Sequence, residues 1–518
     1  MANRAPPFTA HRDALSIARR RGMDKQQLEA NMEAILSHIH GVLPGPPVSA
    51  DAHLCILPDS DGGGVDRVSR LPDALLRDIV SRLPIKDAAR TAALSRRWRP
   101  IWLSAPLVLV DTHLLPAGRG EIPGQVGLAE SSAVAAAVSR ILATHPGPFR
   151  CIRLACSHKD EDHARVSRWL QILAIKGVQE LFLINCPCPF TFITRHMPTT
   201  FFSMATLTRL YLAFWRFPDT ADLPRGAAFP HLRELGLCSV IIESRDLEFV
   251  LARSPVLEIF CLQGHICPPL HFRLVSPSLR CVQIHWSDLV TLTVEEAPCL
   301  ERLILQGDWR KQGKIKICHA PALRLFGYFD PEKHGLHIGN ALIKAGTLVN
   351  ASAMLPAVKI LAVQVHFGAR NDAKMLPSFL RCFPNVERLH ILSMKTDETT
   401  GKLNLKFWQE AGAIECVKSH INLLIFQDFR GEKNELAFLK FFIESAQMLK
   451  NLVIVCANGC FSSKAEVNSK LQTLSTAKKA SKCCLPMVYQ SALPEGGVPW
   501  NFQRGSDFSY SDPFGFLR

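Results

Sequence analysis

Cysteine and histidine are the side chains of this 518-residue chain best suited to nucleophilic or metal chemistry, with 17 and 19 copies. No Cys-x-x-Cys pair occurs, and neither Cys186-Pro-Cys188 nor Cys483-Cys484 has the companion ligands that a four-coordinate zinc site needs. Four other cysteines fall within or beside repeated segments, where buried structural thiols are common: Cys261, Cys281, Cys299 and Cys318. We therefore expect reduced core thiols and no metal site, although a Cys–His pair assembled by folding stays possible.

Enzyme motifs are missing as well. The chain has no phosphate-binding G-x-x-x-x-G-K-[ST] loop, no G-x-G-x-x-G, no H-E-x-x-H and no G-x-S-x-G. A thioester-forming ligase would need a catalytic cysteine, and no cysteine stands out from its repeat context. We predict no catalytic residue and no cofactor.

The formal net charge of +14 would suit a nucleic-acid partner. The basic residues are spread along the chain, however, and no dense basic stretch is interleaved with aromatics. We interpret the charge as a basic solvated surface. No apolar run reaches the 18 residues of a membrane span.

The most informative element is the segment from Asp66 to Trp102, whose pattern predicts three short helices. Proline fits the first turn of a helix, so Leu71-Pro72-Asp73 predicts a helix start. The apolar residues that follow lie on one helical face: Leu75, Leu76, Ile79, Val80 and Leu83.

The second half of this segment predicts two further helices. Leu83-Pro84 should end the first helix, because the residue before proline avoids the α region. Asp87 is expected to cap a helix over 88–94, and Ser95 to cap a third that carries Trp98 and Trp102. Pro100 is expected to kink or fray that third helix. Three short helices make only a marginal core. Part of their apolar surface should therefore face a partner or the next domain.

The succession Leu-Pro, Leu-Pro and Leu94-Ser-Arg-Arg-Trp98 closely resembles the F-box of plant F-box proteins. The resemblance implies a docking module that binds a Skp-type adaptor and through it a cullin RING ubiquitin ligase. It also implies the adaptor-binding residues: Leu71, Pro72, Leu75, Leu76, Ile79, Leu83, Pro84, Leu94, Ser95 and Trp98.

The long middle of the chain repeats an irregular unit, Pro-x-Leu-x-x-Leu-x-Leu. It begins at Pro230, Pro255, Pro277, Pro298, Pro321, Pro356 and Pro384, with weaker copies at Val178 and Leu207. The spacings between the first five of these prolines are 25, 22, 21 and 23 residues, which is typical of leucine-rich repeats. Each repeat should supply one strand of a parallel sheet. The larger gaps after residue 328 predict return segments that contain helices.

Strand side chains alternate, so one position of each repeat should point outward on the concave face of the sheet. These positions are Phe182, Tyr211, Gly236, Cys261, Gln283, Ile304, Gly327, Ala362 and His390. The column is mixed and weakly charged, which suits a protein partner better than a phosphate backbone. The candidate substrate-binding residues are Phe182, Tyr211, Gln283, Ile304 and His390.

A C-terminal block from Trp408 to Lys482 resembles the FBD domain that follows leucine-rich repeats in many plant F-box proteins. An alternating strand pattern around Ile421–Ile425, an amphipathic helix over 436–446 and a strand over 449–455 make it look like one more repeat. We expect it to cap the repeats. The Gly-, Pro- and Ser-rich tail is expected to be disordered.

The expected fold is an F-box of three helices followed by an α/β leucine-rich-repeat horseshoe with an FBD-like cap. The predicted parts are a leader and linker (1–65), the F-box (66–104), the repeats (105–407), the FBD-like domain (408–482) and the tail (483–518). The resemblance implies a non-catalytic substrate receptor that bridges the adaptor to an unknown target protein in the nucleus or cytoplasm. The alternative is a repeat protein outside ubiquitin transfer, associated with nucleic acid or chromatin.

Overall fold

The chain's computed structural model describes two compact units, residues 1–268 (unit 1) and 269–518 (unit 2). The described residues are 34, 36–48, 67–115, 128–156, 163–185, 196–265 except 222 and 225, 268–307, 313–396 except 332 and 348, 401, 403–481, 485–491 and 502–515. Most of the predicted leader and linker, residues 1–33, 35 and 49–65, lies outside them. Residues 36–42 of the leader are helical.

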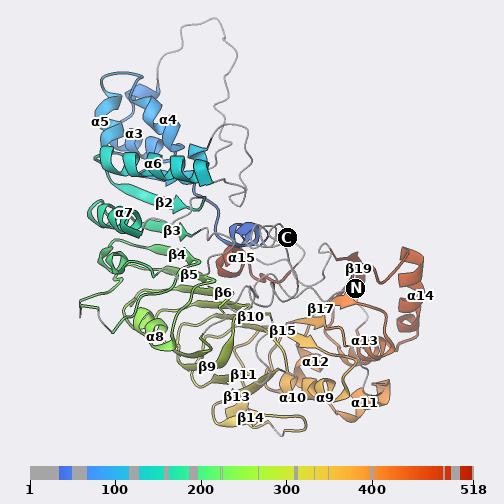
Figure 1. The fold of residues 1–518 in the computed structure, drawn as a ribbon. Helices are drawn as coiled ribbons and strands as arrows, with labels where there is room; N and C mark the ends of the chain where they lie inside the picture. Colours follow the sequence, from blue (N-terminus) through green and yellow to red (C-terminus); the bar gives the residue numbers. More distant parts are fainter. Residues whose placement is uncertain are drawn as a thin grey trace, which may run out of the picture. The chain divides into compact units, whose positions relative to one another are not determined.

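Unit 1 begins with the helices η1 (Val68–Arg70), α3 (Asp73–Ser81), α4 (Ile85–Thr91) and α5 (Trp98–Ser104). They form a small cluster in which α3 and α4 also contact strand β1 (Figure 1). Six parallel strands follow, ordered β1 to β6 across the sheet: β1 (Leu107–Val110), β2 (Phe149–Leu154), β3 (Glu180–Ile184), β4 (Arg209–Ala213), β5 (Glu234–Cys238) and β6 (Ile259–Gln263). The connecting helices are η2 (Asp111–Leu114), α6 (Leu128–Thr144), α7 (His163–Ile175), η4 (Thr199–Ser203) and α8 (Ser244–Ala252).

Unit 2 continues the repeat pattern with strands in the order β8, β10, β12, β15, β16, β17, β18 and β19. Their bounds are β8 (Cys281–His285), β10 (Arg302–Gln306), β12 (Leu325–Phe329), β15 (Ile360–Val365), β16 (Arg388–Ser393), β17 (Leu423–Phe429), β18 (Asn451–Cys456) and β19 (Leu485–Gln490). Neighbouring strands pair in parallel throughout, from β8–β10 to β18–β19. A sheet of parallel strands after an F-box-like helical cluster confirms the predicted fold class.

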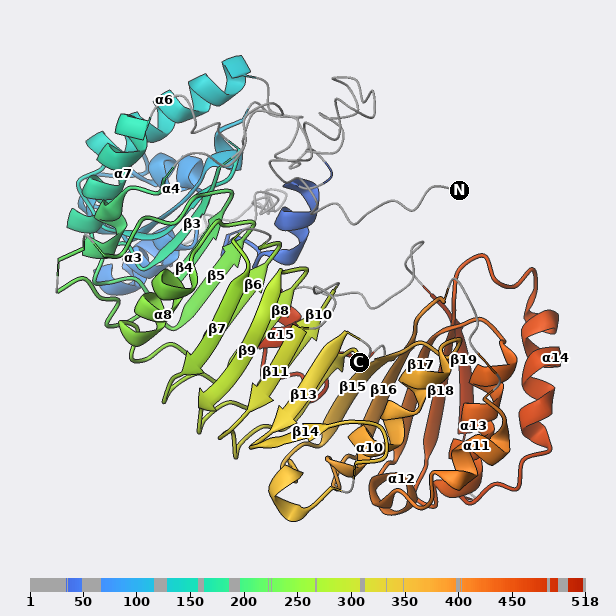
Figure 2. The ribbon, with the colours of Figure 1, turned by 60° about the horizontal axis from the view of Figure 1, so that its bottom comes forward.

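The return segments of unit 2 differ along the chain. The early ones are strands of a second sheet, which Figure 2 shows as a separate layer: β7 (Leu270–Val275), β9 (Leu289–Glu296), β11 (Gly313–Ile317), β13 (His334–Ile338) and β14 (Ala341–Ile343). The later ones contain helices, as the longer spacings predict: η5 (Ala351–Ala353), α9 (Arg370–Ala373), α10 (Met375–Arg381), α11 (Leu405–Glu410), α12 (Glu415–Ser419), α13 (Lys433–Ser445) and α14 (Lys464–Ser475). The second sheet arises because segments such as Leu270–Val275 alternate buried and exposed residues, which is the period of a strand.

The repeat motif has a direct structural cause. The first leucine of the motif is buried, as Leu279, Leu300 and Leu323 show at 0–1% exposure. Just after that leucine, two successive N–H groups donate to one carbonyl of the preceding repeat. The N–H groups of Glu301 and Arg302 bind the Arg280 carbonyl at 2.8 and 3.0 Å. The same arrangement recurs along the chain and fixes the register of each strand on its neighbour.

The predicted disordered tail is wrong for the residues that the structure describes. Leu485–Gln490 pairs with β18 as strand β19, Phe502–Ser506 forms the short helix α15, and residues through 515 lie against the sheet of unit 2. The predicted FBD-like block holds β17, α13 and β18, but β19 continues the sheet beyond it, so the block does not end the sheet. The tail is ordered because it buries large aromatic side chains such as Phe502 and Phe514.

We predict that Gly236→Ala destabilises unit 1. A Cβ at Gly236 would lie 2.2 Å from Cδ1 of the Tyr211 ring, and overpacking a core costs about 1–3 kcal/mol. Hydrogen exchange of strands β4 and β5 should therefore accelerate. Gly335→Ala is the matched control, because its Cβ would meet only Leu342 Cδ1, at 3.9 Å. Equal exchange rates in the two variants would contradict the packing assigned to Tyr211.

Candidate interaction sites

The F-box-like helices start at other residues than the sequence predicts. Pro72 and Pro84 are the residues that precede α3 and α4, so α4 begins at Ile85 instead of Ala88. α5 begins at Trp98, after Arg97, and Ser95 does not cap it. Pro100 falls in the first turn of α5, where a missing N–H costs nothing, so the kink predicted there does not occur.

Arg97 and Trp98 hold the start of α5 against the start of α3. The Arg97 guanidinium donates to the Leu71 carbonyl at 2.6 Å and to Asp73 Oδ1 at 2.7 Å, and also binds the Ser69 carbonyl. The Trp98 indole is 5% exposed and donates to Ser69 Oγ at 3.2 Å. Arg97 and Trp98 of the motif therefore hold the helices of the cluster together.

The predicted adaptor-binding residues fall into three groups by exposure. Leu76, Pro84 and Trp98 are buried and support the cluster. Leu71, Ile79 and Leu83 are half-buried, and Pro72, Leu75, Leu94 and Ser95 are exposed. Leu75 and Leu94 have 51% and 66% of their surface exposed. These exposed leucines are the part of the motif that a partner could contact.

The predicted concave column of unit 1 is assembled in register. Strand pairing aligns Arg153, Phe182, Tyr211, Gly236 and Cys261, and we call this set the inner row of unit 1. Phe182 and Tyr211 stack with ring centroids 4.9 Å apart. Neither side chain is accessible, at 0% and 1% exposure.

Part of the leader lies on this face of unit 1. The buried Arg153 guanidinium donates to the Pro44 carbonyl at 2.7 Å, and Gln263 Nε2 lies 2.8 Å from His38 Nε2. Ile39 and Val42 of the leader are buried. Sequence reasoning missed Arg153 and Gln263, because neither belongs to the predicted column and no short motif marks them.

In unit 2, the corresponding set is Gln283, Ile304, Gly327, Ala362 and His390, the inner row of unit 2. Pairing aligns Gln283 with Ile304, Ile304 with Gly327, and Ala362 with His390. Gln283, Ile304 and His390 are each 0% exposed. The residues align in two runs, because the register shifts between Phe326 and Phe329 and no pairing joins Gly327 to Ala362. Gln283 and His390 contact the C-terminal segment.

An acidic side chain of the C-terminal segment, Asp512, contacts His390 on this row. His390 Nε2 lies 3.0 Å from Asp512 Oδ2, and Arg388 Nη1 lies 3.4 Å from the same oxygen. Burial opposes ionisation of Asp512, but the charges and hydrogen bonds of His390 and Arg388 outweigh it and lower the pKa to about 2. The carboxylate therefore contributes stability above its unfolded pKa of about 3.9 and loses it only as the pH falls towards 2.

Of the cysteines that the structure describes, eight are buried and three are exposed. Burial raises the pKa of Cys281 and of Cys416 to about 12, which makes both poor nucleophiles at neutral pH. Cys299, Cys318 and Cys460 are exposed, contrary to the expectation of core thiols. In the described residues, no group of three or more His, Cys, Asp or Glu side chains is placed to hold a metal ion.

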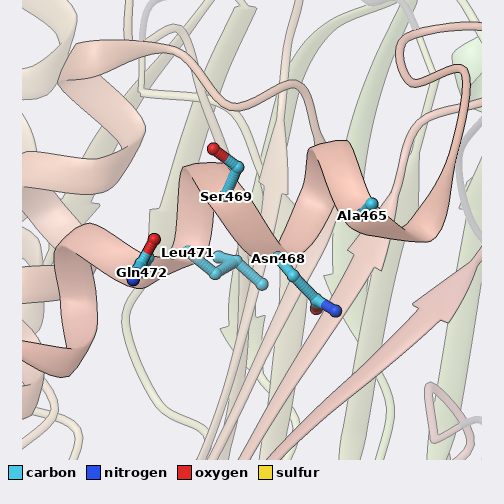
Figure 3. Close-up of a pocket in the computed structure, with 5 residues that line it drawn as sticks. All are labelled: Ala465, Asn468, Ser469, Leu471 and Gln472. Carbon is cyan, nitrogen blue, oxygen red and sulfur yellow. The ribbon is translucent and has the colours of Figure 1, made fainter.

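A surface hollow beside α14 offers no reactive group. Figure 3 shows that it is lined by Ala465, Asn468, Ser469, Leu471 and Gln472 of this one helix. None of these side chains carries a carboxylate, imidazole, amine or thiol. Among the described helices, none has the length and apolarity that crossing a membrane requires.

Three family models match the chain in succession. Residues 68–109 match the F-box domain, residues 166–391 match the leucine-rich repeats of FBD-associated F-box protein At5g56370, and residues 409–454 match FBD. The matched segments contain, in order, the helical cluster, the repeat strands through most of β16, and β17 with α13 and most of β18.

Curated relatives from Arabidopsis thaliana have the same parts in their names. F-box/LRR-repeat protein At3g26922 is 29% identical over 48% of this chain and 78% of its own length. FBD-associated F-box protein At5g38590 is 23% identical over 76% and 94%. F-box/FBD/LRR-repeat protein At1g78750 is 24% identical over 82% and 96%. With an F-box, leucine-rich repeats and an FBD segment in this order, the chain belongs to the plant F-box/leucine-rich-repeat/FBD proteins.

Proposed function

We propose that the chain is the substrate-recognition subunit of a Skp–cullin–F-box type ubiquitin ligase. The observation that carries the proposal is the pair of exposed leucines, Leu75 and Leu94, on a helical cluster that matches the F-box domain. Exposed leucines on so small a cluster suit a docking surface, because fully burying a leucine side chain in an interface gains about 1.5–3 kcal/mol.

The repeats supply a separate surface for a target protein. The receptor itself forms and breaks no bonds in this proposal. It raises the effective concentration of target lysines near a charged ubiquitin-conjugating enzyme, so its contribution is proximity. The buried, high-pKa thiols support a non-catalytic role, because a thioester-forming cysteine must ionise readily.

Affinity purification of the chain from plant cells, with and without proteasome inhibition, tests this proposal. We expect a Skp-type adaptor and a cullin in both samples, and a target protein that accumulates only when the proteasome is blocked. Recovery of the chain without any adaptor would overturn the proposal. If nucleic acid were recovered instead, its affinity should fall log-linearly with salt concentration.

A further inference from the structure

The C-terminal segment, residues 502–515, binds the inner row of unit 2 largely through its backbone. Gln283 Nε2 donates to the Phe502 carbonyl at 3.0 Å. The Arg302 guanidinium donates to the carbonyls of Gly505, Asp507 and Tyr510 at 2.8, 3.0 and 2.7 Å. Arg302 comes from β10 and is 6% exposed. Among the residues that the structure describes, the buried Arg302 guanidinium therefore donates its hydrogen bonds to the C-terminal segment.

The side chains of the segment occupy adjoining positions on the same sheet. Phe508 lies over two guanidinium groups, 4.0 Å from Arg280 and 4.5 Å from Arg302. Phe514 is 1% exposed, and its ring centroid lies 4.9 Å from that of Tyr328 and 5.4 Å from that of His390. Asp512 lies between Phe508 and Phe514 in the sequence. The segment therefore presents an aromatic, an acidic and an aromatic side chain to the sheet in that order.

This arrangement resembles the recognition of a peptide more than the packing of a core. The segment joins no sheet, and α15 has five residues. Side chains of the sheet bind main-chain carbonyls, which another chain folded into the same helix and turns would also present. Specificity comes from one acidic and two aromatic side chains. A separate polypeptide with the same groups could make the same contacts.

We propose that the inner row of unit 2, with the neighbouring Arg302, Tyr328 and Arg388, is a binding site for a short aromatic and acidic segment of the target protein, with the chain's own C-terminal segment as its resident competitor. The inference rests on the proposed role of the repeats in target capture. It specifies the chemistry of the target: an aspartate for His390 and Arg388, a phenylalanine beside Tyr328 and an aromatic ring over Arg302. Nucleic-acid phosphates would also accept hydrogen bonds from Arg302, but they would leave the buried position of the Phe514 ring unfilled.

The test uses the full chain and a fluorescent synthetic peptide with the sequence of residues 500–518. In an open-tail variant, Asp512→Ala with Phe514→Ala weakens the internal segment. We expect the peptide to bind this variant at least about tenfold more tightly than the wild type, since an internal competitor acts at a high effective concentration. Adding Arg302→Met should remove the binding. The matched control is Arg273→Met in the open-tail variant, because Arg273 pairs with Glu295 on the second sheet and should leave peptide affinity unchanged.

Equal peptide affinity for the wild type and the open-tail variant would overturn the inference, and so would undiminished binding after Arg302→Met. Hydrogen exchange of β8 and β10 checks that the variants stay folded. If they do not, a protease site placed within 493–500 of the otherwise unchanged chain gives a second test. After cleavage, excess peptide should displace the C-terminal fragment. Retention of the fragment until the sheet unfolds would overturn the inference.

Adaptor binding measured on the same variants separates this inference from the proposed function. Adaptor affinity should be the same in the wild type and the open-tail variant. Failure of the peptide tests with intact adaptor binding would overturn the inference alone. Peptide binding without any adaptor binding would overturn the ubiquitin-ligase role and leave the peptide site in place.

Discussion

Replacing Leu75 and Leu94 together by glutamate should abolish adaptor binding while leaving the chain folded. Both side chains are more than half exposed, at 51% and 66%, so their replacement empties no cavity and should change stability by no more than about 0.5 kcal/mol each. If each leucine contributes about 2 kcal/mol to the free energy of adaptor binding, replacing both should lower the affinity at least about 100-fold. Calorimetric titration with a Skp-type adaptor measures the loss.

The control for this pair is Ile175→Glu, which places the same charge on an aliphatic side chain of α7 that is 86% exposed. Its adaptor affinity should equal that of the wild type. Undiminished binding by the double variant would show that the adaptor does not contact this face of the helical cluster.

Trp98→Ala should abolish adaptor binding by a different route, the loss of the cluster itself. Removing a buried tryptophan typically costs about 3–5 kcal/mol, and three short helices have little stability to spare. The indole also gives up its hydrogen bond to Ser69 Oγ. Hydrogen exchange over residues 73–104 should accelerate by more than a hundredfold, while β8, β10 and β12 keep their protection.

Leu103→Ala is the comparison for Trp98→Ala, because Leu103 lies on the same helix and is 46% exposed. It should leave exchange in the helical cluster nearly unchanged. A slow-exchanging cluster in the Trp98→Ala variant would contradict the bracing role assigned to this tryptophan. Together with the glutamate pair, these variants separate residues that form the surface from residues that support it.

The repeat strands were predictable because their sequence signal is local and periodic. One buried leucine and one strand per repeat fixed the register well enough to place Phe182 opposite Tyr211, and Gln283 opposite Ile304. The F-box helices were predictable for the same reason. The residues at which these helices start were harder to predict. Pro84 and Arg97 directly precede α4 and α5, and the side-chain capping bonds expected at Asp87 and Ser95 do not form.

The covering of the inner rows could not be predicted from local pattern. Gln283 meets Phe502 across 219 positions, and Arg153 meets Pro44 across 109. Contacts from a side chain to a distant backbone carbonyl impose no periodicity on the sequence. One signal was available: the tail contains Trp500, Phe502, Phe508, Tyr510 and Phe514, whereas disordered segments are poor in aromatic residues.

The proposed function requires that this chain dock onto a Skp-type adaptor through its F-box helices. Size-exclusion chromatography with light scattering, on the purified full chain mixed with a recombinant plant adaptor, measures this docking. We expect a stable complex with one copy of each protein, which the Leu75→Glu and Leu94→Glu double variant fails to form. Separate elution of wild-type chain and adaptor, across the adaptors of one plant, would contradict it.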